Sequence, residues 1–123
     1  MSINRLYLDS KATHRLGSLK ARTKLNRNVI ARVALLISLK EDVIPDFGKF
    51  DSSGMEMNRT TLTGDFDDYI ISLIKIWLLN NDLEISDTNV KNVLTYHVNN
   101  GVTKMISITK NGLIGLAEYF CNN

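Results

Sequence analysis

Hydrophobic residues recur at helical spacing along most of this chain and alternate with polar residues in one short stretch near its start. This contrast constrains the fold more than any other feature, because the two periods belong to different secondary structures. The alternating stretch, INRLYL, predicts a short β-strand over 3–8. Its two expected faces are Leu6 and Leu8 on one side, and Ile3, Arg5 and Tyr7 on the other. The expected fold class is therefore mainly α, with a short N-terminal strand followed by helices in a single domain spanning 1–123.

Two helices are predicted directly after the strand. The first begins at an N-cap formed by Asp9 or Ser10 and continues to about Thr23. Its buried stripe consists of Ala12, Leu16 and Leu19. The second helix contains RNVIARVALLISL and can be capped by Asn26 or Thr23. It is apolar over more than half of its circumference, so we expect it to be buried on several sides by its own chain or by another copy.

A strand, a helix, a short polar turn and a second helix occur in this order in the ribbon–helix–helix DNA-binding fold, in which strands of two chains pair. The stretch KATHRLGSLKARTKLNRNVIARVAL is similar to that family in pattern, so the predicted fold is ribbon–helix–helix-like at its start. Ribbon proteins read bases with the outward side chains of the strand. Here Arg5 is the one good base reader on that face, beside Ile3 and Tyr7. The strand is thus better suited to subunit association than to reading a sequence.

The rest of the chain divides into a polar loop and an apolar, acidic helical half. The loop is expected over 41–62, which contains the only proline, and its length suggests that it packs on something. The helical half covers 63–120 and opens with a helix capped by Thr63 or Asp65. The expected stripe of this helix is Phe66, Tyr69, Ile70, Leu73, Ile74 and Trp77. Further apolar residues lie outside the stripe, namely Ile71, Ile76, Leu78 and Leu79. So small a chain cannot cover such a helix, and we therefore expect self-association.

A later helix is predicted in SDTNVKNVLTYHVNNGV. It begins at Asp87 or Thr88, continues to about Asn100 and is ended by Gly101. The remaining residues predict one or two short helices.

The charge of the chain is unevenly distributed. Residues 1–40 hold nine Lys and Arg and one acid, a net charge of +8, whereas residues 41–123 carry a net charge of −6. Six of the basic residues, with no acidic one among them, lie within 10–27. They are Lys11, Arg15, Lys20, Arg22, Lys24 and Arg27, and we call them the basic collar. A collar around the exposed part of one helix and the turn after it is expected of a nucleic-acid-binding protein. The alternative is a solvated helix face without a ligand.

Residues that could carry catalysis are few and scattered. His14 and His97 have no cysteine or second histidine at the spacing of metal ligands, and His97 has a simpler interpretation as a histidine at a helix end that makes a structural hydrogen bond. The group Asp65, Asp67 and Asp68 could bind Mg²⁺, but acidic residues in a first helical turn also favour the helix dipole. We therefore expect no enzyme, no metal and no cofactor.

Targeting and redox features point to the cytoplasm. The single cysteine, Cys121, cannot form an intramolecular disulfide. No stretch near the start is apolar enough for a signal peptide, and the longest apolar run, YIISLIKIWLL, is short and interrupted by Lys75. The expectation is a soluble cytoplasmic protein without a membrane partner.

Three segments together resemble the DndE family of bacterial DNA phosphorothioate modification: RLYLDSKATHRLGSLKART, LTGDFDDYIISLIKIWL and HVNNGV. The resemblance spans about residues 5 to 118. It implies a small helical protein that forms a tetramer and binds double-stranded DNA, preferentially nicked, through surface lysines. It also implies action beside a cysteine desulfurase and the other proteins that replace a phosphate oxygen with sulfur. The lysines available for that role are Lys11, Lys20 and Lys24, with Arg15, Arg22 and Arg27 around them.

Two other functions stay open on the residues alone. A dimeric ribbon–helix–helix repressor or antitoxin would take its specificity from Arg5 and Tyr7. A Mg²⁺-dependent DNA nickase would use Asp65, Asp67 and Asp68.

Overall fold

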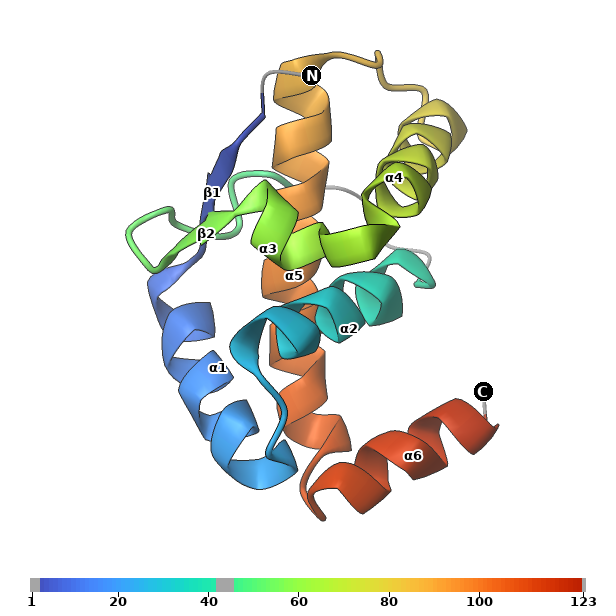
Figure 1. Cartoon of the computed structure of the whole chain (residues 1–123). Coiled ribbons are helices and arrows are strands. Elements are labelled where there is room, and N and C mark those ends of the chain that lie inside the picture. Colours follow the sequence, from blue (N-terminus) through green and yellow to red (C-terminus); the bar gives the residue numbers. More distant parts are fainter. Residues whose placement is uncertain (1–2, 42–45, 123) are drawn as a thin grey trace.

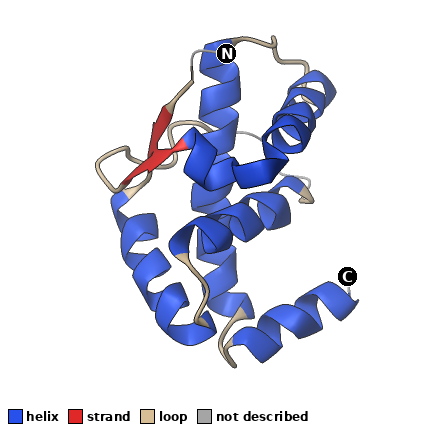
Figure 2. Cartoon of the chain, viewed as in Figure 1, coloured by secondary structure: helices blue, strands red, loops and turns tan. Residues whose placement is uncertain are grey.

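A computed structural model describes residues 3–41 and 46–122, and its central element is the long helix α5, Asp87–Ile108 (Figure 1). The helices that pack on α5 are α1 (Ser10–Thr23), α2 (Arg27–Leu39), α4 (Asp67–Asn80) and α6 (Leu113–Asn122). The contact between α2 and α5 is the most extensive. Helices dominate the fold and two short strands lie at its edge (Figure 2), so the expected fold class is confirmed.

The start of the chain largely follows the prediction. Strand β1, Arg5–Tyr7, buries Leu6 and exposes its two flanking residues. Helix α1 begins after an Asp9 N-cap, as expected, and α2 begins after Asn26. Ile3 is buried rather than outward-facing, because it precedes the strand and joins the core.

The partner of β1 lies in the same chain. Strand β2, Glu56–Asn58, pairs with β1 in antiparallel register and places Met57 opposite Leu6, both of them buried. The ribbon is thus intramolecular, whereas a ribbon–helix–helix protein pairs the strands of two chains. The prediction of a loop over 41–62 is wrong for its second half. This pairing places β2 there, and a short helix, α3 (Arg59–Thr63), follows it. Of the remainder of that loop, 42–45 lie outside the described residues.

The start of α4 also differs from the prediction. A 3-10 turn, η1 (Gly64–Phe66), separates α3 from α4, so that Phe66 rather than Thr63 or Asp65 occupies the N-cap position. The backbone of Gly64 has a positive φ of 56°, and this conformation interrupts the helical path.

The predicted end of α5 is wrong. The helix continues through Gly101 to Ile108, because Gly101 lies at the contact with α2, where a side chain would overlap the backbone of Ala34. Gly101 therefore allows two helices to approach each other closely and does not end α5. In residues 3–41 and 46–122, no helix has the combination of length and hydrophobicity that crossing a membrane requires.

Candidate nucleic-acid interface

The first turn of α1 is held by two aspartates. The carboxylate of Asp9 accepts hydrogen bonds from the backbone N–H groups of Lys11 and Ala12, at 3.0 and 3.3 Å, and so satisfies donors that a helix start leaves unpaired. Its other oxygen accepts from the backbone N–H of Asp51 at 2.9 Å. Asp51 in turn accepts from the backbone N–H of Ser10, at 2.9 Å. These bonds fix the orientation of the helix that carries most of the collar.

The loop before β2 is tied to the same place. Hydrogen bonds from the backbone N–H and hydroxyl of Ser53, and then from Ser10, lower the pKa of the Asp51 carboxyl well below its usual range. At Gly54 an added Cβ would come 2.6 Å from the carbonyl oxygens of Leu8 and Asp9, so only glycine allows the loop to pack this closely. The loop and the start of α1 therefore form one rigid unit.

The structure gives each member of the collar a place on α1, in the turn after it, or at the start of α2. Five of the six are exposed and Arg15 is half-buried. Within the described residues, four have neither an ion pair nor a side-chain hydrogen bond. These are Lys11, Lys20, Lys24 and Arg27.

The two arginines of α1 are anchored to α5. Arg15 donates to the hydroxyl of Thr103 at 3.1 Å, and Arg22 donates to the backbone carbonyl of Ile106 at 2.8 Å. Each bond uses one Nη1 group, which leaves further N–H donors on the guanidinium for a ligand. Their position beside α5 is fixed by these bonds, so they can offer donors with little further ordering.

Lys24 ends α1 in the left-handed conformation, with φ 65° and ψ 13°. Its backbone N–H donates to the carbonyl of Lys20 at 2.9 Å and completes the last turn. The helix end thus holds two lysines one turn apart, at the C-terminus where the helix dipole favours cations.

One cation beside the collar was missed by the sequence analysis. Lys49 is exposed and lines the same pocket as Lys11 and Arg15. Its ammonium lies 5.3 Å from the centre of the Phe50 ring, within the range of a cation–π contact. The sequence around Lys49 does not connect it with α1. The two segments come together through the hydrogen bonds of Asp51 to Ser10 and Asp9.

Asp65 of η1 and the two aspartates in the first turn of α4, Asp67 and Asp68, do not surround a common site. Asp67 pairs with Arg59, which donates to its two oxygens at 2.9 and 2.7 Å. This hydrogen bonding is the main reason that the pKa of Asp67 is lowered and that of Arg59 raised. Asp65 and Asp68 are exposed. Across 3–41 and 46–122, His, Cys, Asp and Glu form no group of three or more that could hold a metal ion.

The two histidines have different surroundings. His14 is exposed, whereas His97 is fully buried in the middle of α5. Its Nδ1 lies 2.7 Å from the Ser38 hydroxyl, which also accepts from the Asn100 amide at 2.8 Å. Burial lowers the pKa of His97 from 6.5 to about 4. The expected structural hydrogen bond is therefore present, but the expected helix-end position is wrong because α5 continues past Gly101.

One of the two base-reading residues expected of a repressor has a partner within the chain. Arg5 forms an ion pair with Glu56 of β2 at 3.1 Å, and both side chains are exposed. Tyr7 is 42% exposed. Of the outward residues that a ribbon would use, Arg5 thus already has an acidic partner.

One of the comparisons with known proteins identifies a family. A sequence profile described as DNA sulphur modification protein DndE matches residues 5–111. A search of curated proteins gives no significant match.

Two solved structures share the fold. The crystal structure of DndE from Escherichia coli B7A, involved in DNA phosphorothioation modification, has a TM-score of 0.69 at 20% identity and covers 85% of this chain and 99% of its own. The crystal structure of a DndE mutant involved in DNA phosphorothioation has a TM-score of 0.70 at 18% identity, with the same coverage.

Proposed function

The chain belongs to the DndE family of DNA sulphur modification proteins, and we propose that it is a non-catalytic DNA-binding protein of phosphorothioation. It binds double-stranded DNA in the cytoplasm and prefers nicked duplexes. The proposed contacts to the DNA backbone are Lys11, Arg15, Lys20, Arg22, Lys24 and Arg27.

The single observation that carries this proposal is the set of four unpaired cations in the collar. Lys11, Lys20, Lys24 and Arg27 are exposed and, in the described part of the chain, have no acidic partner. Phosphate oxygens are the acceptors that such side chains bind in DNA, and these contacts position a protein without selecting a sequence. We therefore expect binding that depends strongly on salt and little on sequence.

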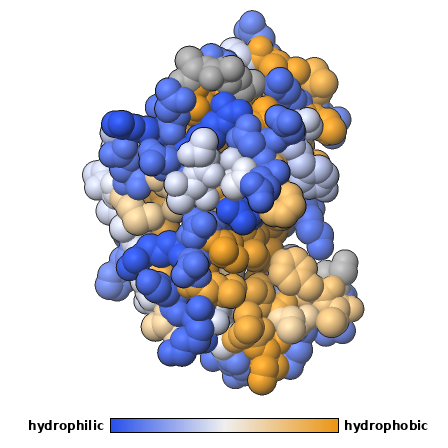
Figure 3. Space-filling view, in the orientation of Figure 1, coloured by the Kyte–Doolittle hydropathy of each residue, from blue (hydrophilic) through white to orange (hydrophobic). Residues whose placement is uncertain are grey.

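Association into a tetramer is the second part of the proposal. Four apolar side chains on and just before α4 remain more than half exposed: Phe66 55%, Tyr69 63%, Ile76 53% and Leu79 61%. Figure 3 shows hydrophobic residues over α4 and in a band between α2 and α6, while hydrophilic residues cover the outer side of α1. Contacts through the apolar surfaces would repeat the basic collar on several subunits.

A repeated collar explains a preference for nicks. A strand break removes stacking continuity, so the duplex bends there at a lower cost and can follow a surface made by several subunits. The chemistry of sulfur transfer is assigned to partner proteins, including a cysteine desulfurase.

The test compares nicked and intact duplexes of several sequences in gel-shift titrations, with and without Mg²⁺. We expect tighter binding to every nicked duplex, no dependence on Mg²⁺ and no cleavage. Preference for one intact sequence would favour the repressor, and Mg²⁺-dependent cleavage would favour the nickase.

A further inference from the structure

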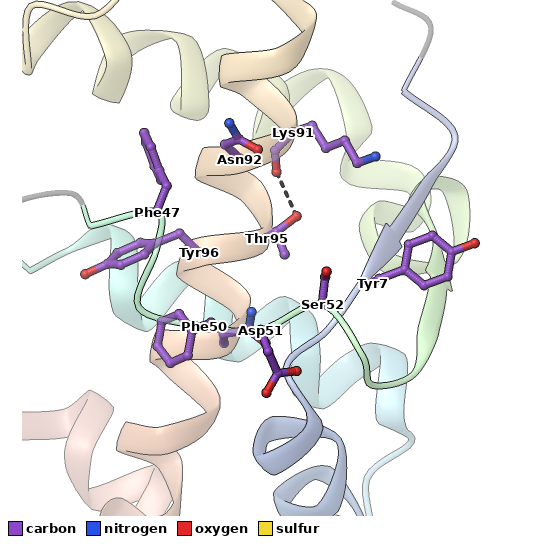
Figure 4. Close-up of a pocket in the computed structure, with 10 residues that line it drawn as sticks. Tyr7, Phe47, Phe50, Asp51, Ser52, Lys91, Asn92, Thr95 and Tyr96 are labelled. Atoms are coloured by element: carbon purple, nitrogen blue, oxygen red, sulfur yellow. Dashed lines mark hydrogen bonds between the residues drawn. The ribbon is translucent and has the colours of Figure 1, made fainter.

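A pocket of about 350 Å³ lies between α5 and the loop that precedes β2 (Figure 4). Phe47, Phe50 and Tyr96 gather on one side of it, and Tyr7 of β1 lies on the other. The Tyr96 ring centre is 5.7 Å from that of Phe50 and 6.2 Å from that of Phe47. Tyr96 is buried, and the rings of Phe47 and Phe50 are inclined to it by 85° and 60°. The accessible aromatic surface of this wall therefore belongs to Phe47 and Phe50, and a flat ring can stack on one of them.

An unpaired amide belongs to the same pocket. Asn99, 1% exposed, lines it and accepts from the backbone N–H of Asp9 through Oδ1 at 3.1 Å. Its Nδ2 has no hydrogen-bond partner among the described residues. A buried donor without a partner is costly, and a ligand with an acceptor would relieve that cost. The exposed amide of Asn92 and hydroxyl of Ser52 add further neutral donors and acceptors.

A second pocket, rich in cations, adjoins the first. The cations that line it are Lys11, Arg15 and Lys49. The two pockets share Phe50 and Asp51 as lining residues. Asp9 and Asp51 are the acidic residues of the second pocket, and their carboxylates accept hydrogen bonds from the start of α1 and from Ser53. The pocket thus has three cations and two carboxylates that already accept hydrogen bonds. Its net charge is positive and suits an anion.

We propose that the two pockets together bind one unpaired nucleotide. Its base stacks on Phe50, the ring that packs against the buried Tyr96, and offers an acceptor to Asn99. Its phosphate lies among Lys11, Arg15 and Lys49. Aromatic stacking combined with neutral amide donors is how proteins hold an unstacked base. The inference rests on the proposed function, because that function supplies the nucleotide: a base displaced at a break in the duplex, where unstacking costs least. A free nucleotide offers the same chemistry.

The test follows the side-chain amide NMR signals of Asn99 and Asn92 in the full chain. Three ligands are titrated: an intact duplex, the same duplex with one unpaired nucleotide at a nick, and deoxyadenosine monophosphate. We expect the unpaired nucleotide to shift the Asn99 signal, whereas the intact duplex does not. We also expect the nicked, unpaired ligand to bind about fivefold or more tightly than the intact one, the minimum expected from stacking one base.

Two variants locate the effect. Phe50→Ala and, as a milder change, Asn92→Ala should reduce this preference while affinity for the intact duplex stays the same. Asn80→Ala, at an exposed asparagine of α4 outside both pockets, is the matched control and should keep the preference.

The outcomes separate the inference from the function. Binding of the intact duplex with an unmoved Asn99 signal for all three ligands overturns the inference and leaves the proposed function in place. An Asn99 shift with the monophosphate, without any preference among duplexes, supports the site and assigns it a free nucleotide. If neither duplex binds, the proposed function fails, and the monophosphate decides for or against the site.

Discussion

Gly101 of α5 lies directly against the backbone of Ala34 on α2, so closely that a Cβ at position 101 would overlap the Ala34 carbonyl. This contact joins the two helices that share the largest interface of the molecule. We predict that Gly101→Ala lowers the free energy of unfolding by about 1–3 kcal/mol or more, because the helices must move apart. Urea denaturation measures the change.

Gly17 provides the control for this substitution. It also lies inside a helix, but a Cβ there would meet nothing within 4 Å. Gly17→Ala should therefore raise stability by about 0.5–1 kcal/mol, because alanine has the better helix propensity. Equal effects of the two substitutions would show that the close approach at Gly101 does not limit the packing.

The buried His97 makes stability depend on pH. Burial lowers its pKa from 6.5 to about 4, so the unfolded chain takes up a proton at a higher pH than the folded chain. The free energy of unfolding is then highest above about pH 6.5. It falls as the pH drops toward 4, by up to about 1.4 kcal/mol per pH unit. Denaturation curves between about pH 5 and 7 measure this slope. We expect His97→Gln to flatten it and His14→Gln, at the exposed histidine, to leave it unchanged.

The pair Arg59–Asp67 has a structural role. The lowered pKa of Asp67 means that its contribution to stability is present above 3.8, the usual value, and is lost as the pH falls through the lower folded-state pKa. Asp67→Asn should cost about 1–3 kcal/mol at neutral pH, since it weakens a charged hydrogen bond to a mostly buried arginine. Asp68→Asn, at an exposed carboxylate, should change stability by less than about 0.5 kcal/mol.

The same variant tests the nickase alternative. The parent protein and Asp67→Asn should both leave supercoiled plasmid uncut in Mg²⁺ or Mn²⁺. Nicking by the parent that Asp67→Asn abolishes would establish the enzyme instead.

Self-association is predicted from the exposed apolar side chains of α4. Light scattering at micromolar concentration should give a mass near four times that of the 13.9 kDa chain. Ile76→Glu should reduce that mass while circular dichroism stays the same, because Ile76 is 53% exposed in the single chain and its replacement leaves the core intact. A parent protein that is a monomer would contradict the tetramer.

Features of the fold that depend on local chemistry could be predicted from the sequence. The Asp9 cap, the extent of α1 and the alternation around Leu6 follow from hydrogen bonding and periodicity within a few residues. The pairing of β1 with β2 could not be predicted, because it depends on a contact between segments about 50 residues apart in sequence. The prediction that Gly101 ends a helix is wrong for the same reason. A glycine after asparagines is typical of a helix end, and only the contact with α2 shows that the helix continues.

The candidate interface also contains residues that the sequence singles out and residues that it does not. The collar is a prediction from charge and spacing, because all its members lie in one short stretch, and its contact with DNA stays a prediction. Lys49 and the aromatic pocket could not be predicted, since the hydrogen bonds of Asp51 to Ser10 bring their loop to α1.

The most direct test of backbone binding is a salt series with two single variants, each titrated against two unrelated duplexes. Every phosphate contact releases condensed counterions, so the slope of log K against log salt should be about −0.9 per contact. Lys20→Ala should weaken binding to both duplexes alike and flatten the slope by about one unit, because a phosphate contact carries no base information. Arg5→Ala, which removes the partner of Glu56, should change neither affinity. Loss of discrimination between the duplexes with Arg5→Ala, together with no effect of Lys20→Ala, would contradict backbone binding by the collar.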